Sequence, residues 1–227
     1  MKRVFLLLFV MLSLPCLLFG QRKKYRLPPP LPPSKKENAL AEKHAQCFNS
    51  HTYNALQRRD FVPFNKALTV KLISFDVDNE PNRPVYDDNG KFIEGDTTKQ
   101  DTVLVLTPMA KNNFSLNLRK VKEIKTLTTA DVDALTEIMY NIGETPVKAD
   151  FLEIADPGYS CYNPRNAILF MDIKGQITHY IEICFECHRY YFSSSKMRSI
   201  AYCTQKMDLL KQFFFKKNIR FGTIRNE

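Results

Sequence analysis

Short apolar segments with extended spacing occur in the middle and second half of the chain. Residues 68–75 (LTVKLISF) and 102–106 (TVLVL) are rich in β-branched residues and predict two strands. Residues 167–172 (AILFMD) and 177–187 (ITHYIEICFEC) are apolar runs separated by IKGQ. This pattern predicts a β-hairpin near the C-terminal end.

Helical patterns lie before, between and after these strands. Residues 37–59 contain no Pro or Gly and many good helix formers. Residues 128–143 begin at Thr128 or Thr129, either of which can cap a helix, and stop at Gly143, and residues 202–217 carry apolar positions at helical spacing. Strands and helices mix without strict alternation, which favours an α+β fold: a small, mostly antiparallel sheet with a C-terminal hairpin, packed against two or three helices.

The first twenty residues have the layout of a secretory signal peptide. Lys2 and Arg3 precede an apolar run over 4–19, and Gly20 is a small residue before Gln21. We therefore expect residues 1–20 to be removed and the chain to be exported to the periplasm or cell envelope, or secreted. An uncleaved anchor is the alternative. Lipidation at the apolar run's cysteine, Cys16, is disfavoured because it follows a bulky proline.

The net charge of +9 is concentrated at the N-terminus. Eight of the 33 basic residues lie in 1–36, which leaves 25 basic against 24 acidic residues in 37–227. Residues 21–36 combine six bases with the proline-rich run RLPPPLPPS, which predicts a disordered linker. This basic tail fits contact with anionic surfaces of the envelope. The remaining residues, 37–227, are close to neutral in net charge, and we expect them to form a single domain. Because we expect this domain to lie outside the cytoplasm, we do not expect it to bind nucleic acid.

Residues 76–101 are acidic and rich in turn residues. Eight acids against three bases lie there. A calcium-binding loop of the EF-hand type counted from Asp76 would place Pro81 where glycine is required. A turn-rich loop is the simpler interpretation.

The hairpin register predicts which residues meet. If Asp172 faces Ile177 across the turn, then Ile168 faces Ile181. Continuing the same count brings three cysteines together at the open end of the hairpin.

In this register Arg165 lies opposite Cys184, and Cys161 lies beside Cys187. Residues three apart on a continuing strand point to opposite faces about 10 Å apart. A Cys184–Cys187 bridge therefore needs a sharp turn directly after Cys184, and otherwise Cys161 pairs with one of the two. A structural disulfide suits an exported chain.

Three other chemistries use the same residues. Cys161, Cys184 and Cys187 with His188, or alternatively His179, complete a tetrahedral zinc set. Cys184 and Cys187 fit a thiol–disulfide oxidoreductase in which Arg165 stabilises a thiolate. The run CFECH matches the attachment motif of haem c through Cys184, Cys187 and His188, but the motif lies in a β pattern, so haem is the least favoured.

A second candidate site lies in the first predicted helix. His44, Cys47 and His51 have the spacing of a single helical face, which a metal would need. A mixed polar face with a small buried thiol is the simpler interpretation. Cys203 is likewise expected on a buried face of the last helix. The chain without its first twenty residues has five cysteines, so at least one is free, liganded or bonded to another molecule.

The run CYNPRNAILFMDIKGQITHYIEICFEC resembles a motif of uncharacterised exported bacterial proteins. In those proteins a Cys-aromatic-x-Pro-Arg segment precedes an apolar strand, a glycine turn and a strand that ends in I-C-F-x-C. The matching positions here are Cys161, Tyr162, Pro164, Arg165, Gly175, Ile183, Cys184, Phe185 and Cys187. The resemblance implies export and a shared cysteine centre, does not require His188, and implies no known activity.

The sequence carries no glycine-rich phosphate loop, nucleophile elbow or HExxH motif. We therefore expect a non-catalytic exported domain with a cysteine centre, held by a disulfide or by zinc, that binds an unidentified protein or envelope component. The alternative class is a periplasmic thiol–disulfide oxidoreductase that uses Cys184 and Cys187.

Overall fold

The computed structural model describes residues 32–76, 85–86, 92–93, 104–110, 113–148 and 163–224. Residues 36–227 belong to one compact unit. The predicted signal peptide, most of the basic linker and of the acidic loop, and Cys161 lie outside the described residues. None of the helices in the described ranges is long and apolar enough to cross a membrane.

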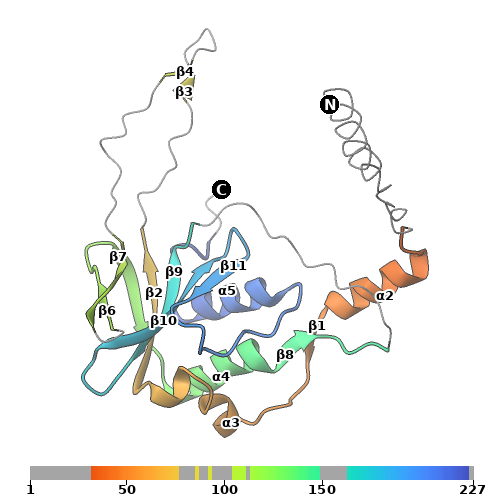
Figure 1. Ribbon diagram of the computed structural model, residues 1–227, viewed down its shortest axis with the longest axis horizontal. Helices are drawn as coiled ribbons and strands as arrows, with labels where there is room; N and C mark the ends of the chain where they lie inside the picture. The colour runs from red at the N-terminus through yellow and green to blue at the C-terminus, as the bar shows by residue number, and fades with distance from the viewer. Residues whose placement is uncertain are drawn as a thin grey trace, which may run out of the picture. The chain divides into compact units, whose positions relative to one another are not determined.

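The fold is α+β, and its main sheet is antiparallel throughout (Figure 1). The described part of the chain gives this sheet seven strands, in the order β5-β6-β10-β9-β2-β7, with β11 also paired to β10. Their bounds are β2 Thr69–Phe75, β5 Leu106–Pro108, β6 Phe114–Leu116, β7 Val121–Thr126, β9 Asn166–Met171, β10 Ile177–Cys184 and β11 Arg189–Phe192. Two short strand pairs do not belong to this sheet: β1 Cys47–Asn49 with β8 Ile142–Glu144, and β3 Val85–Tyr86 with β4 Phe92–Ile93.

The described helices are α2 Lys35–Ala45, α3 Ala55–Arg59, the 3-10 helix η2 Phe64–Lys66, α4 Thr129–Tyr140 and α5 Lys206–Lys216. The prediction of one helix over 37–59 is wrong in its middle. The chain leaves the helix after Ala45 so that β1 can pair with β8, and Asn54 then starts α3 with a capping box. A distant strand overrides a favourable local propensity here.

Helix α4 begins as predicted. The Thr128 side chain accepts a hydrogen bond from the amide of Asp131, and the Asp131 side chain accepts one from the amide of Thr128. The helix ends earlier than predicted because Ile142 belongs to β8. The buried Lys206 ammonium group of α5 donates hydrogen bonds to the carbonyl of Ile138 in the last turn of α4 and to that of Ile142 in β8, so one side chain satisfies carbonyls on both sides of this helix–strand junction.

The predicted hairpin is β9–β10, and Ile168 faces Ile181 as expected. A bulge between Ile177 and His179 shifts the turn end of the register, so Ile177 pairs with Met171 instead of Asp172. The bulge also moves Ile177 to the sheet face opposite His179 and Ile181. The first predicted strand corresponds to β2, whereas β5 begins at Leu106 and so lies mostly beyond the predicted 102–106 segment.

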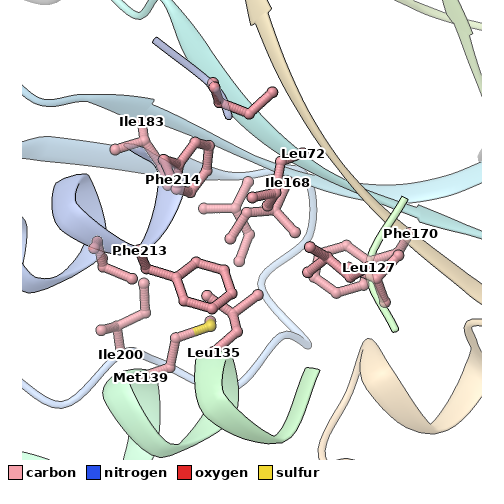
Figure 2. Packing of buried hydrophobic residues seen from close by; sticks show 14 of the residues in the cluster. Leu72, Leu127, Leu135, Met139, Ile168, Phe170, Ile183, Ile200, Phe213 and Phe214 are labelled. Carbon is pink, nitrogen blue, oxygen red and sulfur yellow. The ribbon is translucent and has the colours of Figure 1, made fainter. Parts of the chain in front are cut away.

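The larger core lies between one face of the sheet and helices α4 and α5 (Figure 2). Leu72 and Ile168 from the strands meet Leu135 of α4 and Phe214 of α5, and all four are fully buried. A smaller core lies on the opposite face of the sheet and is covered by β5 and β6. Its buried members are Ile73, Phe75, Val105, Leu106, Ala167, Leu169, Ile177 and Tyr180.

Candidate functional site

The candidate site is the turn between β10 and β11. β10 ends at Cys184, which pairs with Arg189 at the start of β11, so the chain reverses within residues 185–188. His188 has a φ of 52°, the left-handed conformation that lets the turn close. This is the sharp reversal that a close approach of Cys184 and Cys187 requires.

The reversal brings the two cysteines into contact. The backbone amide of Cys187 donates a hydrogen bond to Sγ of Cys184 over 3.3 Å. Both residues are buried, each 1% exposed. The turn therefore holds the Cys184 sulfur against the backbone of Cys187, inside the protein instead of at its surface.

The two sulfurs are in different states. Cys184 is a free thiol, whereas Cys187 is disulfide-bonded. Cys47 and Cys203 are bonded to each other, so neither of them bonds Cys187. The predicted partner, Cys161, lies outside the described residues, and its pairing remains a prediction.

Arg165, the predicted stabiliser of a thiolate, lies against the C-terminal segment. Its guanidinium carbon is 5.6 Å from the centre of the Phe221 ring. Gly222, with a φ of 74°, passes so close that a Cβ there would lie 2.4 Å from Oδ1 of Asn166 and 2.9 Å from Cβ of Arg165. The position of Arg165 thus serves the docking of residues 221–222 onto β9.

Sequence reasoning missed a disulfide between Cys47 and Cys203. Their Cα atoms are 5.0 Å apart although 156 positions separate them in the sequence. Cys203 is fully buried, as predicted, but it precedes α5 and is bonded instead of being a small hydrophobic side chain. Because both residues were assigned to helices, no signal in the sequence pointed to this pair.

The helical face proposed for His44, Cys47 and His51 does not exist, because α2 ends at Ala45. His44 lies beside β8, with Nδ1 2.8 Å from the carbonyl of Thr145 and Nε2 3.4 Å from Glu144. His51 is in a loop and faces Glu137 of α4 instead. Within the described ranges, no group of three or more His, Cys, Asp or Glu residues is arranged to hold a metal ion. The zinc set that includes Cys161 is not tested by this finding.

An ion pair between the buried Arg58 and the half-buried Glu137 links α3 to α4 near β1. Nη1 of Arg58 lies 2.7 Å from Oε2 of Glu137, and Nη1 also donates to the carbonyl of Tyr53. Burial acts to raise the pKa of Glu137, but hydrogen bonds from Asn49 and Asn141 and the charge of Arg58 hold it below its ordinary value. The network fixes the segment between β1 and α3 on the helix, which is a structural role.

Comparison with known proteins gives no further assignment: no family model, no curated protein and no solved structure matches the chain. The candidate site therefore has to be interpreted from its own geometry.

Proposed function

We propose that the chain is an exported, non-catalytic binding domain whose C-terminal half is held by cysteine bonds. The burial of the cysteine turn carries this proposal. A catalytic thiol has to reach its substrate, and reactive cysteines are typically partly exposed. Cys184 and Cys187 are each 1% exposed, and Cys187 is already bonded.

The disulfide between Cys47 and Cys203 supports export. Disulfides persist in oxidising compartments and are rare where thiols are kept reduced. This bond joins a segment before the sheet to the segment that leads into α5. Together with the predicted signal peptide over 1–20, it favours the periplasm, the envelope or the exterior as the site of action.

A disulfide is favoured over zinc or haem at the turn. Zinc is held by thiolates, and the thioether bonds of haem c also form from free thiols. The sulfur of Cys187 is bonded to another sulfur and offers neither. The CFECH run moreover forms a turn between two strands, whereas a haem attachment motif is usually helical.

Thiol–disulfide exchange is the second candidate, and one observation favours it. The free thiol of Cys184 lies beside a disulfide-bonded Cys187. Attack of the Cys184 thiolate on Sγ of Cys187 would form a Cys184–Cys187 disulfide and release the former partner of Cys187 as a thiolate. Such a step conserves atoms and electrons within the chain.

An insulin-reduction assay on the full chain separates these functions. The non-catalytic proposal predicts the same slow precipitation of insulin by dithiothreitol with the wild type, with Cys184→Ser and without protein. Acceleration by the wild type that is lost in Cys184→Ser would overturn it and would establish the exchange activity. Circular dichroism of Cys184→Ser is the control, because it shows whether a lost acceleration comes from unfolding.

A further inference from the structure

The smaller core leaves an apolar cavity open beside it. The cavity has a volume of about 560 Å³, within the usual range of sites for small molecules. It lies between β5 and β6 on one side and β2, β7, β9 and the start of β10 on the other. Nine of the fourteen described residues that line it are apolar, Leu169, Met171 and Ile177 among them, and Lys71 and Lys174 are the charged ones.

The course of the chain creates this cavity. β6 pairs with β10 through a single position, Ile177 with Phe114, and a turn over 117–120 then leads directly to β7 at the other end of the sheet order. Strands at opposite ends of the sheet are therefore tied by a short connection, and β5 and β6 lie across the sheet face that the helices do not cover. The side chains of the smaller core fill part of the enclosed space.

Apolar side chains remain exposed where the cavity opens. Met109 is 58% exposed, Leu118 68% and Ile124 46%. An apolar ligand that covers them removes this surface from water, which is favourable by about 25 cal/mol per Å².

Lys71 places a positive charge on this otherwise apolar face. It lies on β2 directly opposite Leu169 of β9, two positions before the buried Ile73. Lys71 is half-buried and forms no salt bridge with any residue of the described ranges. A half-buried ammonium group without a partner is stabilised by a bound anion.

The rest of the lining adds positive charge and no negative charge. Lys174 lies in the β9–β10 turn, and none of the described residues that line the cavity is Asp or Glu. The nearby Asp172 is not one of the lining residues, and its Oδ1 accepts hydrogen bonds from the backbone amides of Lys174 and Gln176.

We propose that this cavity binds a single-chain amphipathic anion, with its acyl chain against Leu169 and Met171 and its carboxylate or phosphate head at Lys71 and Lys174. This inference goes beyond the function proposed above and is independent of the sulfur chemistry, because the cavity lies at the Ile177 end of β10 and the cysteine turn at the Cys184 end. A flat protein partner would cover the exposed rim but would leave the enclosed volume empty.

The test is displacement of dansyl-labelled undecanoate from the full chain, followed by fluorescence below the micellar concentration of each competitor. We expect displacement by dodecanoate and by dodecyl phosphate, and the tighter of the two identifies the head group. Dodecyltrimethylammonium has the same tail with a positive head, and we expect it to displace the probe at least about tenfold less well. Equal displacement by cation and anion, or no binding of the probe, would overturn the proposal.

Matched lysine variants test the role of Lys71. Lys71→Met keeps the aliphatic stem and removes the charge, and we expect affinity for dodecanoate to fall about tenfold or more. Lys125→Met is the control, because Lys125 is exposed on β7 opposite Leu72 and so lies on the other sheet face. Equal losses in the two variants would contradict a head-group site at Lys71.

Ile124→Glu tests the apolar rim at an exposed position. We expect it to abolish probe binding while its circular dichroism spectrum stays that of the wild type. Sedimentation of the unliganded protein tests whether a second copy of the chain occupies the rim instead. A dimer that this substitution dissociates would assign the rim to that second copy and overturn the ligand proposal.

Discussion

Cys47 and Cys203 are disulfide-bonded with Cα atoms 5.0 Å apart, so β1 is fixed to the segment that leads into α5. Three hydrogen bonds accompany this disulfide: the Cys47 amide donates to the Gln205 side chain, and the amide and hydroxyl of Thr204 both donate to the Ala45 carbonyl. These contacts join residues that are far apart in the sequence. It explains how a short two-stranded pair outside the main sheet is held in place.

Removing this disulfide should destabilise the fold. For the double substitution Cys47→Ser and Cys203→Ser we expect a loss of about 2–5 kcal/mol, because the bond closes a long loop in the unfolded chain. Urea denaturation followed by circular dichroism measures it. Cys184→Ala is the matched control, since it removes a buried sulfur that is not bonded. An equal or smaller loss in the double variant than in the control would contradict a structural role of the bond.

The ion pair of the buried Arg58 should matter more than the exposed pair beside it. Arg58→Leu removes a buried guanidinium group that bonds Glu137, Thr136 and the carbonyl of Tyr53, and we expect a loss of about 1.5–3 kcal/mol, the usual range for hydrogen bonds to charged groups. Arg59 pairs with Asp133 at 3.1 Å but is 36% exposed, so Arg59→Leu should cost no more than about 1 kcal/mol. Urea denaturation of both variants measures the difference, and equal losses would contradict a larger role for the hydrogen bonds of Arg58.

Asp131 should make the stability depend on pH under acidic conditions. A hydrogen bond from Lys217 and the cap at Thr128 lower its pKa from 3.8 to about 2. Since the folded pKa lies below the unfolded one, the carboxylate stabilises the fold above pH 4, and this contribution falls as the pH drops from about 4 to 2.

Asp131→Asn provides the measurement. We expect it to be less stable than the wild type at pH 6, and the difference should shrink as the pH approaches 2. Thermal unfolding at several pH values, with Asp208→Asn in α5 as the control, measures this. A difference that stays constant over the acidic range would mean that Asp131 acts without its charge.

Local patterns predicted the parts of the fold that local contacts stabilise. Helix α4 has its cap within three residues of its start, and the β9–β10 hairpin closes over a short turn. Both elements therefore depend on contacts between residues that are close in the sequence. The register of Ile168 with Ile181 followed from the same locality. The bulge at Ile177 could not be predicted in this way, because Ile177 also pairs with Phe114 of β6, which is distant in the sequence.

The parts of the fold and of the candidate site that were not predicted depend on contacts between residues distant in the sequence. A helix over 37–59 is favoured by its composition, but pairing of Phe48 with Gly143 and the bond to Cys203 override it. For the candidate site, the hairpin placed Cys184 at a strand end, and the requirement for a turn after it was recognised. The state of each sulfur and the close approach of Gly222 to β9 depend on packing that no sequence period reveals.

The most direct test of a structural disulfide at the turn between β10 and β11 is the state of each sulfur in the native chain. The protein is alkylated without reductant, alkylated with a second label after denaturation, and digested for mass spectrometry. We predict that Cys184 takes only the second label and that the peptide with Cys187 is recovered disulfide-linked to the peptide with Cys161. Recovery of a Cys184–Cys187 disulfide, or of Cys187 as a free thiol in a protein that carries equimolar zinc, would contradict this prediction.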